Sequence, residues 1–454
     1  MGVVKVLTKI ACNVKVFLAI TFVFTGAIFE SQAEGINKNI LKISLVQAIE
    51  ASLNSMEEVK ISKVETEKVY HKYREAQAAR YPDLTGHGQW LNNARYPVNA
   101  RYPKGYISDY EAGAGVILSQ VIYSFGRISS AVEAAEKALE IGELNEQVKR
   151  EDVIYNAKVS YYTVIFAQKA LEIVQESYNN SLDNKKILEN RSSAGRVSRK
   201  DNIKIEADIA ARIPLVTNVE ADVISAQNTL KRVMGLDFEV DIELVEDFGE
   251  NYNEKDYDDL VKYLWSREPT LKMMEENVFL KESLVKVEKA GYMPYLSGFA
   301  SWDYAGRSDQ GKAWYIGKED LMDQFGVLGL QIEIPIFDSG RVREKIKQSQ
   351  KEKDKAVLEL SKTLRDMDLE LSNAVAQYNE YVKTLEANLR SVELSLRSFK
   401  LFQDLFSTGQ VTLLELNDAE LTLSKQKLAR ETTLYDLNIT LARIERLIAE
   451  GVKK

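Results

Sequence analysis

The feature that most constrains the fold of this chain is an internal duplication. Two glycine-containing phrases each occur twice: YSFGRI at 123–128 with FDSGRV at 337–342, and SAGRVS at 193–198 with STGQVT at 407–412. The members of both pairs lie 214 positions apart. Pro82 and Pro294 recur at almost the same offset. A shared offset across several landmarks indicates that one structural unit has been copied.

We expect each unit to contain a helix, two strands and a long helical hairpin. The first unit is assigned to 34–236 and the second to 257–450, with a connecting, equatorial segment at 237–256. Each unit begins with a predicted helix, at 44–80 and 256–290. A proline soon after each helix ends the helical pattern, because proline has no amide hydrogen and cannot continue a helix.

A heptad pattern predicts very long helices after the strands. Apolar residues recur at every seventh position of the second unit: Val357, Leu364, Leu371, Tyr378, Leu385, Val392, Phe399 and Phe406. A second set, beginning at Leu360, completes the alternating spacing of three and four that forms a coiled-coil seam. The helix at 339–407 would be about 100 Å long at a rise of 1.5 Å per residue. A similar helix is expected at 127–191, with return helices at 197–234 and 411–449.

The hairpins are expected to turn at 192–197 and 407–412, at Gly195 and Gly409. Glycine readily takes the left-handed conformation that stops a helix. After each turn, a hydroxyl residue stands at the N-cap position with an acidic residue three positions later: Ser198 with Asp201, and Thr412 with Glu415. This spacing is typical of a capping box at the start of a return helix.

Alternating side chains predict two strand pairs. The strands are placed at 83–95, 109–124, 294–305 and 324–337. In the last of them, Leu328, Leu330 and Ile332 share one face, and Gln331 and Glu333 share the other. This period of two fits an outer-membrane barrel and also a half-buried soluble sheet, and the sequence leaves both open. Four strands cannot close a barrel, which needs about eight. An outer-membrane barrel would therefore require several copies of the chain.

Residues 1–33 have the pattern of a secretory signal peptide. Basic residues precede an apolar run at 16–29, which ends in a small-x-small exit: Lys5, Lys9 and Lys15, then Ser31, Gln32 and Ala33. A membrane anchor is the alternative, but the run is shorter than the about 20 residues that a span needs. Cleavage after Ala33 would remove Cys12, the only cysteine, so the mature chain is expected outside the cytosol without disulfides.

Composition excludes several functions. Two histidines and one cysteine cannot supply the clusters that zinc sites and Cys–His or Ser–His catalysis need, so we expect no enzyme activity, cofactor or metal. A net charge of −8 argues against nucleic-acid binding, which usually needs a basic face. No segment after the expected signal peptide has 18 consecutive apolar residues, so strands would have to make any membrane crossing.

Taken together, the sequence resembles the TolC-like outer membrane efflux protein family, also called outer membrane factors. The likeness runs from about 41 to 449. It rests on the tip turns and on the strand-to-helix phrases with Gly126-Arg127 and Gly340-Arg341. The resemblance implies a mainly α fold with membrane β. Three copies would form a periplasmic α-barrel of coiled-coil helices, topped by a shared 12-stranded barrel in the outer membrane of a Gram-negative-type cell.

The implied function is an outer-membrane channel-tunnel of a tripartite export system. It would be a passive exit duct for small molecules, driven by an inner-membrane RND or ABC pump through a periplasmic adaptor (membrane fusion protein). A duct for type I protein secretion has the same fold and stays open as an alternative. A periplasmic coiled-coil adaptor is an alternative of another class, but adaptors carry one helical hairpin rather than two.

The resemblance also implies functional residues at the tip. Asp201 and Asp418 match acidic positions of the pore gate. The alternative for each is an exposed carboxylate in the first turns of a helix. The family often has a tyrosine at the position of Phe406 and an arginine at that of Val411. Since both polar partners are missing, we expect hydrophobic closure by Phe406. The turn residues expected to contact the adaptor are Ser193, Gly195, Val197, Ser198, Ser407, Gly409, Val411 and Thr412.

Overall fold

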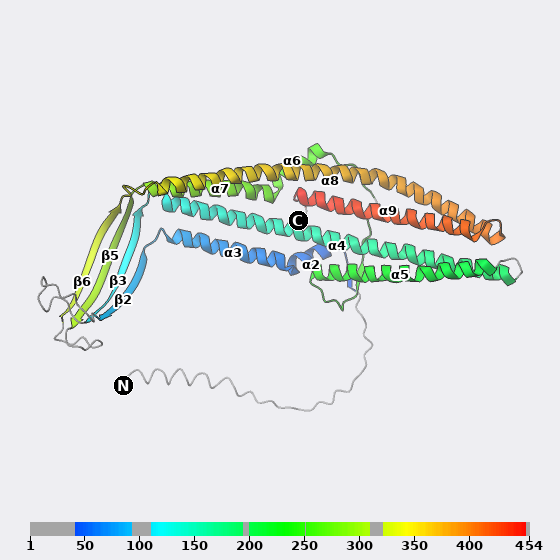
Figure 1. Ribbon diagram of the computed structural model, residues 1–454, viewed down its shortest axis with the longest axis horizontal. Coiled ribbons are helices and arrows are strands. Elements are labelled where there is room, and N and C mark those ends of the chain that lie inside the picture. Colours follow the sequence, from blue (N-terminus) through cyan, green and yellow to red (C-terminus); the bar gives the residue numbers. More distant parts are fainter. Residues whose placement is uncertain (1–40, 93–109, 194–198, 250, 309–320, 451–454) are drawn as a thin grey trace, which may run out of the picture. The chain divides into compact units, whose positions relative to one another are not determined.

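The computed structural model describes residues 41–92, 110–193, 199–249, 251–308 and 321–450 (Figure 1). Contacts separate Met1–Asn39, which include the expected signal peptide and lie outside the described residues, from Ile40–Lys454. The description below applies to the second unit. Within the described ranges, no helix is long and apolar enough to span a membrane.

The four long strands form one antiparallel sheet. They are β2 (Asp83–Asn92), β3 (Tyr110–Tyr123), β5 (Tyr295–Ser308) and β6 (Leu321–Glu333), in the order β2-β3-β5-β6. Each repeat therefore contributes one hairpin, and the two hairpins join through β3 and β5. β2 and β6 are the outer strands, and among the described residues nothing pairs with their outer edges.

The strand expected at 324–337 ends earlier than the sequence pattern suggested. β6 stops at Glu333, although the alternation continues through Ile334 and Ile336. Pro335 explains this difference, because a residue without an amide hydrogen cannot donate to a strand ladder. β5 instead runs three residues beyond its expected end at 305.

The sheet has one apolar and one mainly polar face. Val116 lies opposite Trp302, and Trp302 opposite Gly326, so these positions share a face. The exposed apolar side chains of this face are Leu84, Trp90, Val116, Leu118, Trp302, Leu328, Leu330 and Ile332. The other face carries mostly polar side chains, with apolar exceptions that include Leu91, Ile117, Val121, Phe299, Phe325 and Val327. Since successive residues of a strand point to opposite sides, the sequence itself separates the two faces.

Each repeat adds four helices to its strand hairpin. The first repeat has α2 (Leu45–Ser55), α3 (Glu57–Ala78), α4 (Arg127–Ser193) and α5 (Arg199–Met234). The second has α6 (Tyr257–Arg267), α7 (Pro269–Lys289), α8 (Arg341–Thr408) and α9 (Leu413–Leu447), with a short 3₁₀ turn, η1 (Ala290–Tyr292), after α7. α4 has 67 residues and α8 has 68. Each is therefore about 100 Å long.

The single helices expected at 44–80 and 256–290 are each two helices, so this part of the prediction was wrong. In the second repeat the break falls at Glu268, whose extended backbone precedes Pro269. Proline disfavours the helical conformation of the residue before it, which explains this break. In the first repeat Met56 is extended, and its buried side chain packs with Val59 and Val153.

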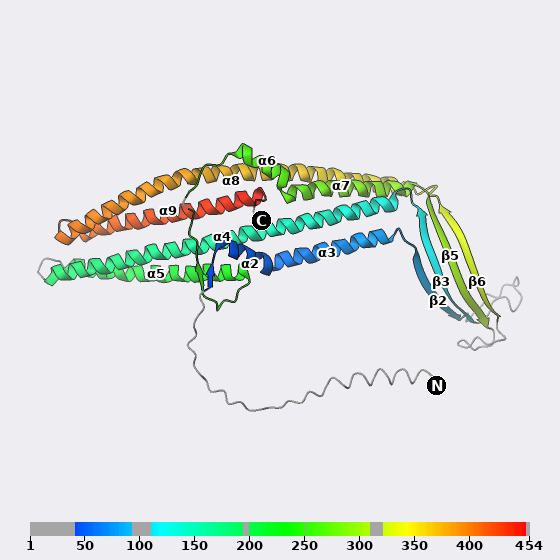
Figure 2. The ribbon, with the colours of Figure 1, turned by 180° about the vertical axis from the view of Figure 1, so that it is seen from behind.

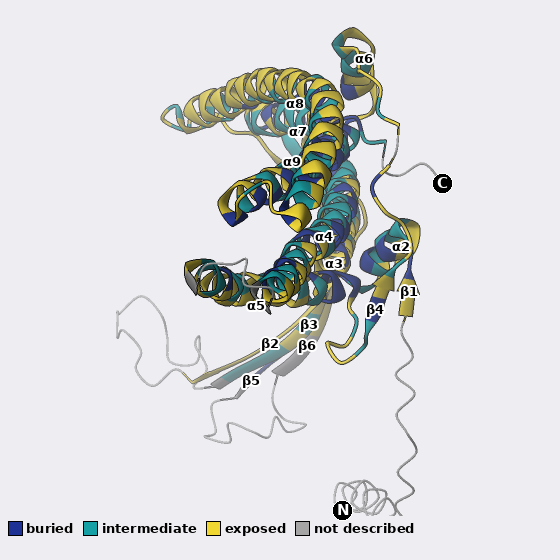
Figure 3. Cartoon of the chain, turned by 90° about the vertical axis from the view of Figure 1, so that its right-hand side faces the viewer, coloured by how far each residue is buried: buried dark blue, intermediate teal, exposed yellow. Residues whose placement is uncertain are grey.

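The heptad seam of α8 is buried only where α9 covers it. Its buried members are Leu371, Tyr378, Leu385, Val392, Phe399 and Phe406. Val357 and Leu364 of the same seam are 41% and 36% exposed. α9 ends at Leu447, which lies in the same core cluster as Leu371, so no return helix covers α8 before that point. Figure 3 shows the exposed residues along the outer side of α8.

A small parallel sheet joins the start of the described chain to the equatorial segment. β1 (Leu41–Ile43) pairs with β4 (Ile242–Leu244), which lies in the equatorial segment. The Tyr161 hydroxyl of α4 donates to the carbonyl oxygen of Ile43 at 3.3 Å, and Ile43 is itself buried. The first strand of the described chain and the segment that links the two repeats are thereby fastened to the same helix.

Candidate functional site: the hairpin ends and the strand-to-helix junctions

The two helical hairpins, α4–α5 and α8–α9, lie side by side and turn at the same end (Figure 2). A common core joins them there. Its buried members are Leu188, Ile205, Phe399, Phe406, Leu413, Leu416 and Leu423. Because this cluster takes residues from all four helices, the two hairpin ends pack as one body.

The turn between α8 and α9 has the expected local structure. Gly409 has a φ of 86°, and its amide donates to the carbonyl oxygen of Phe406 at 3.0 Å. Thr412 caps α9 in a capping box with Glu415, as the sequence predicted. Hydrogen bonds from the Thr412 amide and hydroxyl lower the pKa of the Glu415 carboxyl. Ser407 donates its hydroxyl to the Asp404 carbonyl, and Val411 packs against the core cluster.

Phe406 lies inside the protein and not on a surface. Its ring is 1% exposed, and the guanidinium carbon of Arg191 lies 5.5 Å from the ring centroid. Arg191 Nη1 also donates to the Phe406 carbonyl oxygen at 3.0 Å. The expectation that this ring itself closes a pore needs correction, because an apolar ring at a seam position packs into the core. Arg191 was not among the residues expected from the sequence, because its partner carbonyl belongs to another helix, 215 positions later.

Replacing Gly409 by alanine is expected to destabilise the α8–α9 turn by about 1–2 kcal/mol, since alanine is strained in the left-handed conformation. The new Cβ would also lie 2.7 Å from Arg191 Nη2 and would push this group away from Phe406. Thermal unfolding of the purified protein measures the loss. Gly142→Ala, in the interior of α4 with only ordinary contacts near its Cβ, is the matched control and should not lower stability.

The two candidate gate carboxylates lie near these turns. Asp418 is exposed on α9 and lines a groove of about 410 Å³ together with Ser395, Ser398 and Phe402 of α8. Within the described chain it makes no hydrogen bond or ion pair. Asp201 is half-buried in the first turn of α5. Ser193 is the last residue of α4, and Gly195, Val197 and Ser198 lie outside the described residues.

A buried ion pair, which the sequence analysis missed, links the two hairpins. Glu420 of α9 is 1% exposed. Arg212 of α5 donates to both of its carboxylate oxygens, at 2.9 Å and 2.6 Å. Ser177 of α4 donates to the same carboxylate at 2.6 Å and also contacts Arg212. A carboxylate at a seam position of α9, between Leu416 and Leu423, was the signal that could have revealed it.

Polar side chains also lie near the apolar core that joins the hairpin ends. The Asn417 amide donates to the Asp208 carboxylate at 2.6 Å. Asn184 of α4 is fully buried, and among the described residues neither its side-chain nitrogen nor its oxygen has a hydrogen-bond partner. The Asn417 side-chain oxygen is also without a partner there. Buried polar groups without a partner cost free energy, so these atoms reduce the stability that the surrounding core provides.

Both strand-to-helix junctions have the same unusual backbone. Gly126 and Gly340 have φ values of 89° and 83°, and the residues before them, Phe125 and Ser339, are also left-handed. Two successive left-handed residues favour glycine at the second, which accounts for the repeated Gly-Arg step. Asp338 accepts hydrogen bonds from the Val342 and Gly340 amides, which lower the pKa of its carboxyl. Ser124 caps α4 in the corresponding place.

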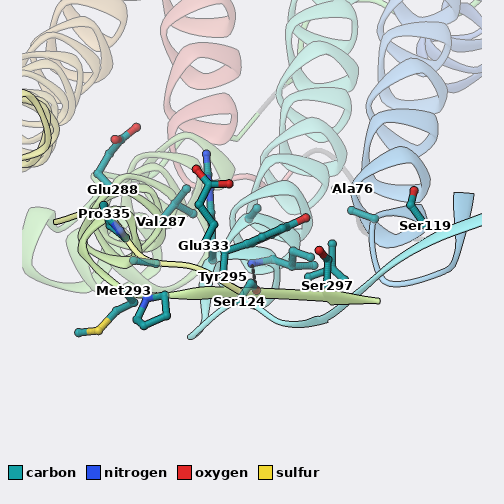
Figure 4. Close-up of a pocket in the computed structure, with 18 of the residues that line it drawn as sticks. Ala76, Ser119, Ser124, Val287, Glu288, Met293, Tyr295, Ser297, Glu333 and Pro335 are labelled. Carbon is teal, nitrogen blue, oxygen red and sulfur yellow. Dashed lines mark hydrogen bonds between the residues drawn. The ribbon is translucent and has the colours of Figure 1, made fainter. Parts of the chain in front are cut away.

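A cavity of about 1210 Å³ lies between these junctions and the polar face of the sheet (Figure 4). Ser119, Tyr295, Ser297 and Glu333 line it from the strands. Its charged lining from the helices and junctions includes Glu75, Arg127, Glu288, Asp338, Arg341 and Lys345. The wall therefore carries charges of both signs, interspersed with apolar side chains such as Ile128 and Val287.

A cross-strand side-chain contact lies further along the same face. His87 of β2 lies 3.0 Å from the carboxylate of Asp303 on β5, reaching across β3. Gly115 of β3 makes this possible, because a Cβ there would be 2.2 Å from the Asp303 oxygen. Groups of three or more metal-ligating side chains are absent from the described residues.

The sequence matches the family described as "Outer membrane efflux protein" over residues 48–236 and 260–450. The two matched segments correspond to the two repeats. Among curated proteins, the chain is 23% identical over 404 residues to the toluene efflux pump outer membrane protein TtgI of Pseudomonas putida, covering 86% of this chain and 82% of that relative. It is 23% identical over 407 residues to the outer membrane protein TolC of Escherichia coli, covering 87% and 80%.

Solved structures share the fold. The outer-membrane channel OprN matches with a TM-score of 0.74 and 19% identity, over 89% of both chains. The CmeC outer membrane channel of Campylobacter jejuni matches with a TM-score of 0.76 and 16% identity, over 90% of this chain and 86% of that one. The comparisons give no support to a periplasmic adaptor. The mainly helical fold, the duplication and the match over both repeats lead to one conclusion: the chain belongs to the outer membrane efflux protein family.

Proposed function

We propose that this protein is the outer-membrane exit duct of a tripartite efflux system for small molecules. The observation that carries the proposal is the sheet. One face exposes large apolar side chains, the other is mainly polar, and both edge strands lack partners among the described residues. An apolar exterior and a polar interior are what a membrane barrel requires, and an isolated open sheet cannot supply them.

Closure of this sheet requires further copies of the chain. Three copies with four strands each give twelve strands, above the minimum of about eight for a barrel. β2 of one copy would pair with β6 of the next. The same symmetry would arrange the paired helical hairpins as a tube through the periplasm, with the junction cavity and its charged wall facing the passage. Export of this kind needs no catalytic group in the duct, since the inner-membrane pump supplies the energy.

The hairpin ends are the proposed gate and the proposed contact with a periplasmic adaptor. Asp418, exposed and without a partner in the described chain, would form a ring of carboxylates with its symmetry copies, and Asp201 would stand near the turn of the other hairpin. Phe406 would contribute from inside, by holding the α8–α9 turn in place through Arg191. The turn residues from Ser407 to Thr412 offer hydroxyl groups and a short exposed loop to the adaptor.

Planar-bilayer conductance of the detergent-purified protein tests this proposal. We expect discrete conductance steps that favour cations, because a ring of carboxylates attracts them. Asp418→Asn should reduce the cation preference, and Asp404→Asn, the same change on α8 outside the groove, should leave it unchanged. Absence of conductance would count against the duct, and an unchanged selectivity in Asp418→Asn would count against the gate ring alone.

A further inference from the structure

Two buried carboxylates come together where α6 ends and α7 begins. Glu268 is the N-cap of α7 and is 7% exposed, and one of its oxygens accepts hydrogen bonds from the Thr270 amide and hydroxyl. Glu151 of α4 is 5% exposed. In each carboxylate the Oε2 atom is buried and has no hydrogen-bond partner among the described residues. Two such oxygens in one place are costly, because a buried acceptor without a donor loses its hydration.

The first repeat shows that the helix break itself needs no acid. Met56 stands at the corresponding break, 212 positions before Glu268, which is the offset that also relates Pro82 to Pro294. The Met56 side chain packs in an apolar cluster with Val59 and with Val153 of α4. Glu268 is therefore a departure from the repeat at a position where an apolar residue suffices.

The positive charges around the two carboxylates are mostly committed to other groups. Arg446 of α9 pairs with Asp152 at 2.7 Å. Lys158 of α4 pairs with Glu445 of α9 at 2.5 Å. Arg150 of α4 acts on Glu151 only as a further nearby charge. Neither Glu151 nor Glu268 has an ion-pair partner of its own within the described chain. The first of the charges that act on Glu151 is that of Glu268. For Glu268 it is that of Arg446, which is already paired with Asp152.

Burial favours the uncharged form of both groups. Burial, and then repulsion by Glu268, raises the pKa of Glu151 to about 7. Burial also raises the pKa of Glu268, against the hydrogen bonds from Thr270. A proton on Glu151 would remove its negative charge and, with it, the repulsion from Glu268.

We propose that Glu151 and Glu268 form a proton-operated joint between α4 and the α6–α7 break. While the pair holds a proton, the break stays packed against α4, with Leu264 and Leu271 buried on either side of it. When the proton is lost to solvent, two carboxylates repel inside the protein and the joint loosens. The equatorial segment, which leads into α6, would then be less firmly held at alkaline than at acidic pH.

The direction of the pH effect follows from the raised pKa. Unfolded Glu151 titrates near 4.5 and folded Glu151 near 7, so the folded form binds its proton more tightly. The stability that this group contributes is complete below the lower value and is lost as pH rises to about 7. Between these two pKa values, each rise of one pH unit shifts the unfolding equilibrium by about tenfold towards the unfolded form, because folding retains one proton.

Thermal unfolding of the full-length, detergent-purified protein tests the joint. Because this measurement does not depend on transport, a negative result for the joint is distinguishable from a negative result for the proposed duct. In the wild type, the unfolding temperature should fall as pH rises from about 5 to about 8. Glu151→Gln and Glu268→Met, the latter restoring the residue of the first repeat, should flatten this slope. Glu275→Gln, at an exposed position of the same helix, is the control and should keep it.

Infrared spectroscopy gives a readout that a purely structural role would not move. The wild type should retain the band of a protonated carboxyl group at about pH 6 and lose it with a midpoint of about 7. In Glu151→Gln that band should be weaker. An unchanged pH slope in both folded variants would overturn the joint. If the variants do not fold, absence of the band from the wild type at about pH 6 would overturn it, and its presence with that midpoint would support it.

Discussion

Arg212→Met is expected to weaken the contact between the two helical hairpins by about 3–5 kcal/mol, because it leaves the carboxylate of Glu420 buried and unpaired. Glu420 is 1% exposed, so water cannot replace the two hydrogen bonds that Arg212 donates. The hydroxyl of Ser177 would remain as its donor, and one neutral hydrogen bond does not compensate for a buried charge. Chemical unfolding of the purified protein measures the loss.

A second substitution distinguishes the net contribution of the ion pair to stability from the destabilisation caused by leaving one buried charge unpaired. Arg212→Met combined with Glu420→Leu removes both charges, and the double variant should recover most of the lost stability. Arg397→Met is the matched control, because Arg397 pairs with Glu393 on the exposed side of α8 and should cost less than about 1 kcal/mol. Equal losses for Arg212→Met and Arg397→Met would contradict the role of the buried pair.

The same variant has a functional consequence if the hairpin ends form the gate. Arg212 of α5 joins the first hairpin to the second through both oxygens of the buried Glu420 carboxylate. Its loss should therefore increase the open time of the channel in planar bilayers.

Leu330→Arg is expected to abolish assembly in the outer membrane. Leu330 is 72% exposed on the apolar face of β6. An arginine facing lipid near the middle of a membrane barrel costs about 2–4 kcal/mol, and the cost would recur in every copy of the assembly. Membrane fractionation and the amount of heat-resistant oligomer in detergent measure the effect.

The neighbouring position provides the control for this prediction. Gln331 is also exposed, but it points to the polar face, opposite Ser297 of β5. Gln331→Arg should leave the amount of assembled protein close to that of the wild type. If both variants assembled equally well, the apolar face would not be in contact with lipid, and the sheet would belong to a soluble protein.

Patterns that repeat along the chain allowed much of the fold to be predicted. The fixed offset revealed the duplication, and the heptads of α8 revealed a seam whose members from Leu371 to Phe406 are buried. Gly409 and Thr412 occupy the turn and cap positions that their chemistry indicated. In each case one residue type at one spacing has a single favourable local structure, so no knowledge of distant contacts was needed.

The remaining features depend on contacts between distant parts of the chain. Phe406 looked like a closing residue because its neighbours could not be known, and the structure places it under Arg191, 215 positions earlier in the chain. The pair of Arg212 and Glu420 spans 208 positions, and no local pattern joins them. No proline follows Met56, so the sequence did not indicate the helix break there. The Met56 side chain instead packs with Val153 of another helix.

One copy cannot enclose a passage, and we expect copies to join through β2 and β6. Since the chain after residue 33 has no cysteine, single cysteines can be placed in β2, at Thr85, and in β6, at Val327, Gly329 or Gln331 in turn. The subunit mass of the oxidised, detergent-purified protein is then measured under denaturing conditions. We expect a covalent trimer for at least one pair of positions. A monomer at every pair of positions, with a native mass of one chain, would show that copies do not join through these strands.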